Sequence, residues 1–494
     1  LKQAVWIDFD NDGDKDLFVA SEEYKNRLYR NDNFIFTDIT VAAGIPDVLL
    51  HTNSGSWGDY DNDGDLDLFL SNRDLNQLIP NMLFRNNGDG TFENVNELSA
   101  IGNVSKITFQ ATFFDYNNDG WLDIYLINDR KVTTNILYHN NGDGTFTDIS
   151  EEAEVGYVMD AMSVGLDDYD ADGFIDVYIT NTAYDQDFPV PANALMKNNG
   201  DGTFSEIAIS SGVSFDRTSW GANFIDMDND GRLDLYVSGF DDTNDNGEVS
   251  AAFYYQNEDI SFTRVLSNGF ETDLAHSYGN ATGDFDHDGY LDIVVANRDP
   301  YTFDLWNNRY YQLLFNKWLK VSLEGVESNR DGYGSRIEIS INGEKQYRVT
   351  TNVESYLSQN SDVESFGVGN VAIIDYVKVT WLSGHIDLIE DVSANQTITI
   401  IEGQSPLTVE DVQTDFDIQL YPNPTKDIIT VKISEFIAGN SEIKIYNMLG
   451  QLVATHLIQQ DEMVVSTSDL YRGTYFISFY KENELVITKK IIKI

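Results

Sequence analysis

The stretch DFDNDGDKD, Asp8 to Asp16, decides the fold, because it is the first of six similar copies along the chain. In every copy positions 1, 5 and 9 are Asp, position 3 is Asp or Asn, and position 6 is Gly. The other five copies are DYDNDGDLD (Asp59 to Asp67), DYNNDGWLD (Asp115 to Asp123), DYDADGFID (Asp168 to Asp176), DMDNDGRLD (Asp226 to Asp234) and DFDHDGYLD (Asp284 to Asp292).

Oxygen donors at this spacing predict a site for a hard cation. Ca²⁺ takes about six to eight oxygens, and a glycine at position 6 permits the sharp turn that wraps a loop around it. We expect about six Ca²⁺ ions, with side-chain ligands at positions 1, 3, 5 and 9 and a backbone carbonyl at position 7. The expected metal ligands are Asp8, Asp10, Asp12, Asp14 and Asp16; Asp59, Asp61, Asp63, Asp65 and Asp67; Asp115, Asn117, Asp119, Trp121 and Asp123; Asp168, Asp170, Asp172, Phe174 and Asp176; Asp226, Asp228, Asp230, Arg232 and Asp234; and Asp284, Asp286, Asp288, Tyr290 and Asp292.

Three other interpretations of the loops fit the sequence less well. Asp, Asn and Gly also form ordinary solvated turns, but six copies with the same acids favour a metal. Mg²⁺ fits less well, since it demands a tighter octahedron and keeps its waters. An EF-hand opens in a similar way but closes with Glu at position 12, whereas here an apolar β-type run follows position 9 directly. Because Asn117 is neutral, we expect the third loop to bind most weakly.

The spacing of the loops predicts a β-propeller. They begin at residues 8, 59, 115, 168, 226 and 284, so the intervals are 51, 56, 53, 58 and 58 residues. A period of this length is typical of propellers and solenoids. Each unit also carries a hairpin signal such as LFRNNGDGTF (Leu83 to Phe92), because Asn and Gly accept positive φ. Four short strands per unit make one blade.

These residues resemble the FG-GAP/VCBS repeats of integrin α-chain propellers and bacterial surface proteins. The resemblance covers residues 1 to about 315 and implies that each calcium loop joins the first two strands of a blade. It implies an all-β fold: a Ca-binding propeller with six visible repeats and six or seven blades, followed by two small β-sandwich-like domains. Since the chain starts directly on the strand before the first loop, we expect that part or all of one N-terminal blade is missing.

A second segment, residues 316–403, resembles the ASPIC/UnbV domain. The resemblance rests on SNRDGYGSRIEI (Ser328 to Ile339), FGVG (Phe366 to Gly369) and VKVTWLSG (Val377 to Gly384). The family usually has Trp-Pro-Ser-Gly where this chain has Trp381, Leu382, Ser383 and Gly384. The resemblance implies an architecture rather than an activity.

Residues 404–418 form a predicted linker, and residues 419–494 resemble the C-terminal sorting domain of the type IX secretion system of Bacteroidetes-type bacteria. The markers are YPNP from Tyr421, YNMLGQ from Tyr446, GTY from Gly473, and the basic residues Lys489, Lys490 and Lys493. The resemblance implies handling by the type IX machinery and a secreted or outer-membrane surface location. The alternative is an ordinary immunoglobulin-like adhesion module.

Composition restricts the classes of function. With 82 acidic and 31 basic residues the net charge is −51, which opposes binding to nucleic acid or anionic lipid. The sequence has no Cys, which excludes disulfides, thiolate metal sites and a Cys nucleophile. It has no run of apolar residues long enough to span a membrane as a helix.

No catalytic constellation is visible in the sequence. The six histidines, His51, His139, His276, His287, His385 and His456, form no metal-ligand motif, and no G-x-S-x-G turn is present. We therefore predict a non-catalytic adhesion or ligand-binding protein for a glycan or an extracellular protein, with Tyr184, Tyr301 and Trp306 as candidate contacts. The alternative is a polysaccharide lyase or hydrolase with its site in the propeller channel, because a fold alone does not decide function. A third possibility is a scaffold within a larger assembly.

Overall fold

The computed structural model divides into two compact units, residues Leu1–Leu407 and Thr408–Ile494. It describes residues 2–493 apart from 103–104, 131–132, 183–191, 216, 241–250, 266–268, 271–274, 310–314, 405–417, 422–424, 434–440, 448–451, 459–461, 469, 471–472 and 482–483. The candidate contact Tyr184, most of the predicted linker and parts of the YPNP and YNMLGQ markers lie outside these residues.

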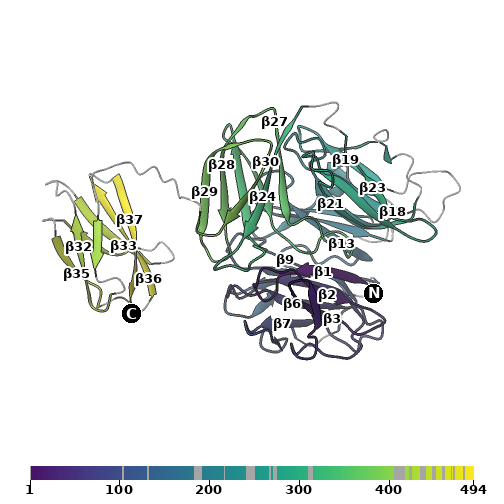
Figure 1. Ribbon diagram of the computed structural model, residues 1–494, viewed down its shortest axis with the longest axis horizontal. Helices are drawn as coiled ribbons and strands as arrows, with labels where there is room; N and C mark the ends of the chain where they lie inside the picture. The colour runs from purple at the N-terminus through teal and green to yellow at the C-terminus, as the bar shows by residue number, and fades with distance from the viewer. Residues whose placement is uncertain are drawn as a thin grey trace. The chain divides into compact units, whose positions relative to one another are not determined.

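The first unit begins with six small antiparallel sheets, each a meander of consecutive strands (Figure 1). We call them blades 1 to 6. Blades 1 to 3 are β1 (Gln3–Ile7), β2 (Asp16–Ala20), β3 (Arg27–Asp32) and β4 (Ile35–Asp38); β5 (Thr52–Gly58), β6 (Asp67–Asn72), β7 (Met82–Asn86) and β8 (Phe92–Asn94); and β9 (Thr108–Phe114), β10 (Asp123–Asn128), β11 (Ile136–Asn140) and β12 (Phe146–Asp148). Blades 4 to 6 are β13 (Ala161–Asp167), β14 (Asp176–Asn181), β15 (Ala194–Asn198) and β16 (Phe204–Glu206); β17 (Thr218–Ile225), β18 (Asp234–Phe240), β19 (Ala252–Gln256) and β20 (Phe262–Val265); and β21 (Ser277–Gly283), β22 (Asp292–Asn297) and β23 (Asp304–Trp306).

This arrangement confirms the predicted propeller-like, all-β fold. The only helix among the described residues is α1 (Ala208–Ser211), a single turn after blade 4. The hairpin signals form the turns between the third and fourth strands, where Gly88 and Gly90 have φ of 70° and 83°. The less regular copies at residues 28–36 and 253–262 also form such hairpins, β3–β4 and β19–β20.

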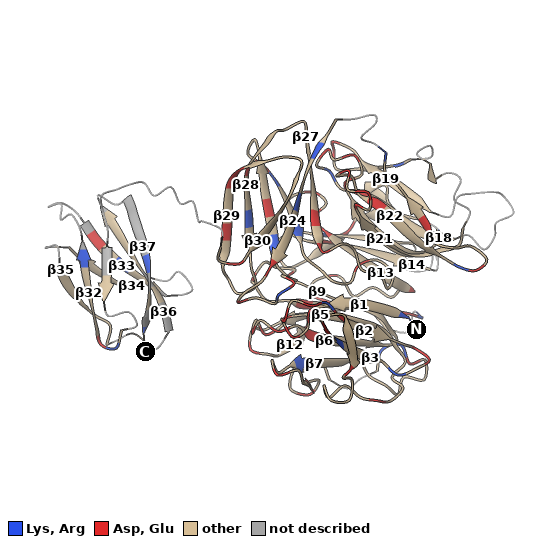
Figure 2. Cartoon of the chain, in the orientation of Figure 1, with Lys and Arg blue, Asp and Glu red and all other residues tan. Residues whose placement is uncertain are grey.

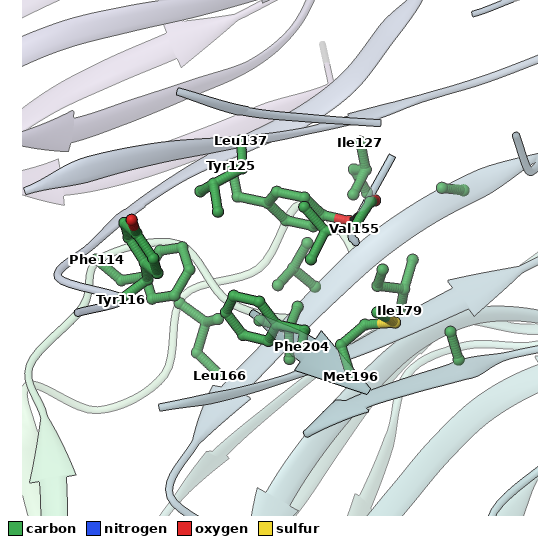
Figure 3. Close-up of a cluster of buried hydrophobic side chains, with 14 of the residues drawn as sticks. Phe114, Tyr116, Tyr125, Ile127, Leu137, Val155, Leu166, Ile179, Met196 and Phe204 are labelled. Carbon is green, nitrogen blue, oxygen red and sulfur yellow. Dashed lines mark hydrogen bonds between the residues drawn. The ribbon is translucent and has the colours of Figure 1, made fainter. Parts of the chain in front are cut away.

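Blades pack face to face, so the first strands of blades 2 to 4 are buried on both sides almost throughout. Every residue of β5 is buried, and a Cβ at Gly55 would overlap the ring of Phe18 in blade 1. Apolar side chains of neighbouring blades then form joint clusters. Figure 3 shows one of them, in which Tyr116 of blade 3 lies beside Phe204 of blade 4, with 6.3 Å between the ring centroids.

The ASPIC/UnbV segment folds as two sheets over one core. One sheet has the order β27-β24-β30 and the other β26-β25-β28-β29, with Val321, Ile337 and Phe366 among the fully buried side chains. The strands are β24 (Lys317–Glu324), β25 (Arg336–Ile341), β26 (Glu344–Val349), β27 (Val363–Gly369), β28 (Ile373–Thr380), β29 (Ile386–Ser393) and β30 (Gln396–Ile401). This sandwich belongs to the same compact unit as the propeller.

The second unit is another small two-sheet sandwich. Its sheets have the orders β31-β32-β35 and β34-β33-β36-β37 around a core that includes Ile443, Ile445 and Ile477. The strands are β31 (Ile418–Tyr421), β32 (Ile428–Ile433), β33 (Ser441–Asn447), β34 (Leu452–Leu457), β35 (Glu462–Ser466), β36 (Gly473–Lys481) and β37 (Glu484–Lys493). The prediction of two sandwich-like domains after the propeller is thereby confirmed.

Candidate metal centre

The six acidic loops occupy the same place in all six blades. Each begins after the first strand, and its position-9 aspartate is the first residue of the second strand, as in Asp16 of β2 and Asp67 of β6. The backbone conformation is also shared. Position 4 has φ between 55° and 60°, and the glycine at position 6 has φ between 89° and 97°. Only glycine adopts the latter conformation without strain, which explains its presence in every copy.

Each loop is organised by its own first and last carboxylates. Asp8 Oδ1 and Oδ2 accept the N–H groups of Asp12 and Gly13 at 3.1 and 2.8 Å. Asp16 accepts the N–H of Phe9 at 3.2 Å and that of Asn31, on the third strand, at 2.7 Å. The other five loops repeat this pattern from Asp59, Asp115, Asp168, Asp226 and Asp284 at position 1 and from Asp67, Asp123, Asp176, Asp234 and Asp292 at position 9.

Carboxylate oxygens converge in five of the six loops. In each group below, one oxygen from every member lies within 4.8 Å of the others. The groups are Asp8, Asp10 and Asp16; Asp59, Asp61 and Asp67; Asp168, Asp170 and Asp176; Asp226, Asp228 and Asp230; and Asp284, Asp286 and Asp292. Asn117 replaces an acid in the third loop, whose described residues form no such group of acids. These groups can hold metal ions, and their donors are the hard oxygens that Ca²⁺ prefers.

Positions 5 and 7 complete the turn of each loop. Asp12, at position 5, accepts the N–H of Asp14, at position 7, at 2.8 Å. The same contact at 2.9 to 3.0 Å joins Asp63 to Asp65, Asp119 to Trp121, Asp172 to Phe174, Asp230 to Arg232 and Asp288 to Tyr290. The position-7 side chains differ in chemistry, so the feature that the six loops share at this position is the backbone.

The electrostatics of the loops favour a bound cation. Burial, together with the charges of neighbouring loop carboxylates, raises the pKa of Asp59, Asp168 and Asp226 to about 7 each. Burial also raises the pKa of Asp16 to about 8 and that of Asp123 to about 7. A buried carboxylate surrounded by like charges is costly to ionise, and a divalent ion among the oxygens removes that cost. The chain has 82 acidic and only 31 basic residues, which Figure 2 colours red and blue where the structure describes them.

Neighbouring loops are joined into a series around the ring. The side-chain N–H₂ of Asn11, at position 4, donates to the carbonyl of Gly64, at position 6 of the next loop, at 3.1 Å. Asn62, Asn118 and Asn229 make the same bond to Gly120, Gly173 and Gly289 at 2.8, 2.9 and 3.1 Å. Ala171 in the fourth loop has no side-chain donor for it. The Asn at position 4 in four copies was the sequence signal for this series.

Sequence reasoning missed one residue per blade that lies near the loop. In each blade this residue comes directly before the Asn or Gln whose backbone N–H donates to the position-9 aspartate. The six residues are Arg30, Arg85, His139, Lys197, Tyr255 and Asn307. Lys197 contacts Asp170 and donates to Asp172 at 3.0 Å, and Tyr255 donates to Asp228 at 2.6 Å. His139 Nδ1 lies 3.1 Å from Asp123 Oδ1, so this histidine belongs to the third loop's surroundings. His287, by contrast, is exposed.

The ASPIC/UnbV sandwich covers the face of the propeller that carries the loops. The N–H of Arg330 donates to Asn11 at 2.8 Å, and the N–H of Asp8 donates to Asp331 at 2.9 Å. A Cβ at Gly64 would lie 2.7 Å from the carbonyl oxygen of Glu327. The acidic loops therefore lie between the propeller and the sandwich, partly shielded from solvent.

Residues 351–361 of the sandwich occupy the propeller axis and contact the first strand of every blade. Gln359 accepts the N–H of Trp6 at 2.9 Å and donates to its carbonyl at 2.8 Å. The N–H of Trp57 donates to Asn352 at 3.1 Å, and that of Ser355 donates to the carbonyl of Val164 at 3.1 Å. The ring of Tyr356 lies against Phe109, Trp220 and Tyr278, with centroids 5.6, 5.0 and 6.2 Å away. The axial channel is thus filled by the protein's own chain.

Family comparisons agree with this architecture. Four matches to the FG-GAP-like repeat cover residues 8–70, 59–126, 115–179 and 168–237. The ASPIC and UnbV family matches residues 325–407, and the secretion system C-terminal sorting domain matches residues 419–494. Among the residues that the structure describes, we find no helix with the length and apolar character needed to cross a membrane.

Individual relatives share a low sequence identity with this chain. Cartilage acidic protein 1 of Homo sapiens is 23% identical over 424 residues, covering 80% of this chain and 62% of its own length. The Xenopus tropicalis protein of that name is 27% identical over 266 residues, covering 52% of this chain and 39% of its own. The chain thus spans less than two thirds of these relatives. A solved structure of PorZ, a surface component of the type IX secretion system of Porphyromonas gingivalis, is 11% identical with a TM-score of 0.37, covering 97% of this chain and 58% of PorZ.

The sorting domain shows that the protein is secreted or held at the outer-membrane surface. The chain is a type IX-sorted extracellular protein that carries FG-GAP-like repeats and an ASPIC and UnbV domain.

Proposed function

We propose that the acidic loops bind about six Ca²⁺ ions and that the calcium-loaded propeller is a non-catalytic binding module for a glycan or an extracellular protein. The observation that carries the metal proposal is the convergence of three carboxylates within 4.8 Å in five separate loops. The ligands would be the side chains at positions 1, 3, 5 and 9 and the backbone carbonyl at position 7. The third loop would bind most weakly, because its position 3 is the neutral Asn117.

Calcium would stabilise the joint between the two domains as well as each blade. The loops that would hold it contact the sandwich through Asn11 and Arg330 and through Asp8 and Asp331. The chain has no Cys, so disulfides do not supply its rigidity outside the cell. A site loaded at 100 times its Kd adds about 2.7 kcal/mol to the free energy of unfolding, provided that the unfolded chain does not bind.

The surface that fits the binding role is the face opposite the acidic loops. On an antiparallel meander the connection between strands two and three lies at the other end from the connection between strands one and two. These far connections carry exposed apolar side chains: Tyr24, Leu75, Leu78, Tyr301 and Phe303. Aromatic side chains exposed in loops are suited to stacking on sugars or packing on a partner protein. Trp306 is a weaker candidate, since it packs on Phe270 with 4.9 Å between ring centroids.

The filled axis favours a binding module over the alternative of a polysaccharide-active enzyme. A substrate entering the channel would have to displace Tyr356 and its neighbours in residues 351–361 from contacts with all six blades. An enzyme would therefore need a site elsewhere on the surface.

A screen of the calcium-loaded protein against glycan and extracellular protein arrays tests the proposal. We expect retention without product release, and a loss of at least tenfold in affinity for the double variant Tyr301→Ser with Phe303→Ser. The matched control is Ile373→Ser, which removes an exposed apolar side chain from the sandwich instead. Release of shortened oligosaccharides, or equal loss in both variants, would contradict the proposed role and surface.

A further inference from the structure

A cluster of aromatic side chains lies at the end of the propeller axis opposite the acidic loops. Each loop follows the first strand of its blade, so first strands begin and second strands end at that opposite face. Five members of the cluster lie at or beside these strand ends, and the sixth comes from the axial segment of the sandwich. We call them the axial aromatic cluster: Trp220 in β17, Phe240 at the end of β18, His276 directly before β21, Tyr278 in β21, Tyr301 after β22, and Tyr356.

Trp220 is the centre of the axial aromatic cluster. Tyr356 and Tyr278 lie edge-on to its ring, with centroids 5.0 and 4.8 Å away. Phe240 stacks on Trp220 at 6.2 Å, with 19° between the ring planes. Phe240 is buried, whereas the other three side chains are partly exposed. The cluster therefore has an apolar base and a set of rings that reach the surface.

A stack of three rings extends the cluster into blade 6. His276 lies on Phe240 with 4.9 Å between centroids and 9° between ring planes, and Tyr301 lies on His276 at 6.3 Å and 29°. Tyr301 is 48% exposed. Its backbone is fixed, because its N–H donates to the carbonyl of Arg298 at 2.9 Å and the N–H of Arg298 donates to the carbonyl of His276 at 2.8 Å. An exposed ring on such a support loses little conformational entropy when a ligand stacks on it.

The polar atoms of the exposed rings are not used by the protein. Among the described residues, the hydroxyl groups of Tyr278, Tyr301 and Tyr356 have no hydrogen-bond partner, and neither do the ring nitrogens of His276. Each hydroxyl can both donate and accept a hydrogen bond. A site that combines aromatic faces with a few free polar groups suits a ligand that has apolar faces and a rim of hydroxyl groups.

Charged groups lie beside Tyr356 but neutralise one another. Burial raises the pKa of Tyr356 above its usual value, and the charged groups that act on it are Arg73, Glu22 and Asp129. Arg73 donates to Asp129 from Nε and Nη2 at 2.9 and 2.6 Å, and to Glu22 from Nη1 at 3.1 Å. Lys2 also pairs with Glu22 at 2.8 Å. These paired charges favour an uncharged ligand, and the net charge of −51 opposes an anionic one.

We propose that the axial aromatic cluster is a carbohydrate site for an uncharged glycan. One pyranose ring stacks on the exposed ring of Tyr301, and hydroxyl groups of the glycan bond to the hydroxyls of Tyr278 and Tyr356. This inference rests on the binding role proposed above for the same face, and it adds the class of ligand and the residues that recognise it. Because Tyr356 belongs to the sandwich, the site is complete only when the sandwich occupies the propeller axis.

Removing single oxygen atoms from the cluster tests the site without removing its rings. Tyr278→Phe and Tyr356→Phe, made separately and together, should leave the melting temperature unchanged, because neither hydroxyl bonds to the described part of the protein. The double variant should lower the affinity for a neutral glycan at least about tenfold, since two hydrogen bonds to the ligand are lost. Tyr29→Phe is the matched control, which removes a hydroxyl from a partly exposed tyrosine of β3, outside the cluster.

The probes are trisaccharides of glucose, mannose, galactose and N-acetylglucosamine, with uronate trisaccharides and extracellular proteins as the comparison set. Calorimetry with the calcium-loaded full chain measures the affinities. We expect binding of at least one neutral trisaccharide, a loss of affinity in both single variants and a larger loss in the double variant, and no change in Tyr29→Phe.

The possible failures are distinguishable. A neutral trisaccharide that binds the double variant as tightly as the original chain would overturn the axial site and leave the binding role of the protein intact. Binding of uronates alone or of proteins alone would overturn the uncharged glycan as the ligand. An equal loss in Tyr29→Phe would overturn the assignment of the two hydroxyls. Binding of none of these probes would overturn both this inference and the proposed function.

Discussion

Tyr356 of the ASPIC/UnbV sandwich lies edge-on to Trp220 of β17, with 5.0 Å between the ring centroids and 77° between the ring planes. An aromatic side chain of the sandwich thus lies at the axis of the propeller. Because residues 351–361 contact all six first strands, the propeller and the sandwich depend on each other for their packing.

Replacing Tyr356 by Ala should lower the free energy of unfolding by about 3 kcal/mol, because removing a large packed side chain from an interior leaves a cavity. Urea denaturation in millimolar Ca²⁺ measures the change. Tyr24→Ala, which removes an exposed tyrosine from a surface loop, should change stability by less than about 0.5 kcal/mol. Similar small changes for both variants would mean that the axial segment does not support the propeller.

The calcium-free protein should become less stable as the pH rises from about 4 to 7. The pKa of Asp59, Asp168 and Asp226 is about 7 in the folded chain, against about 3.9 in an unfolded one. In that window the folded state keeps protons that the unfolded state has lost, so unfolding releases protons and a higher pH favours it. Below about pH 4 both states are protonated and these groups contribute no pH dependence.

Saturating Ca²⁺ should abolish this decline, because the bound ions hold the carboxylates ionised in the folded state. The measurement is the urea midpoint at pH 5, 6 and 7.5 for metal-stripped protein with and without millimolar Ca²⁺. The same slope under both conditions would show that these carboxylates do not share a cation.

Asp63→Ala should lower the melting temperature in Ca²⁺ more than Asn117→Ala. Asp63 is a carboxylate side chain in a loop with five acids, whereas Asn117 is a neutral amide in a loop with three. Both side chains also hold a backbone N–H of their own turn, Asp65 at 3.0 Å and Asp119 at 3.1 Å, so loss of that bond is common to the two variants. Calorimetry with and without Ca²⁺ isolates the metal-dependent part, and an equal or reversed order would contradict the ranking.

Deleting residues 419–494 should leave the first compact unit folded and abolish export to the surface. The deleted region forms a separate unit with its own core, whereas the propeller and sandwich belong to the other unit. Fractionation of expressing cells, with the melting curve of the purified remainder as the control for folding, checks this. Normal surface display of the shortened chain would sink the sorting assignment.

The repeated parts of this fold were predictable from the sequence, since each depends on residues close together in the chain. The acidic loops, the strand that follows each of them and the Asn-Gly hairpins all have local signals, and the structure places them at the same points in every blade. The sandwich and sorting domains were predictable for a different reason, which is that their motifs match known families.

The contacts that the sequence did not reveal join residues far apart in the chain. Tyr356 and Phe109 are separated by 247 positions, and no periodicity connects them. Lys197 lies on β15 and Asp170 in the loop before β14, and they meet because β14 and β15 pair in register.

Counting the ions bound by the chain tests the central claim most directly. Metal-stripped protein is titrated with Ca²⁺ in a calorimeter, and the bound metal is counted by native mass spectrometry. We predict five ions of similar affinity, one from each loop with a converging acid group, and a sixth, weaker ion at the loop that contains Asn117. If no calcium were bound at millimolar concentration, and Ca²⁺ left the melting temperature unchanged, the account would be contradicted.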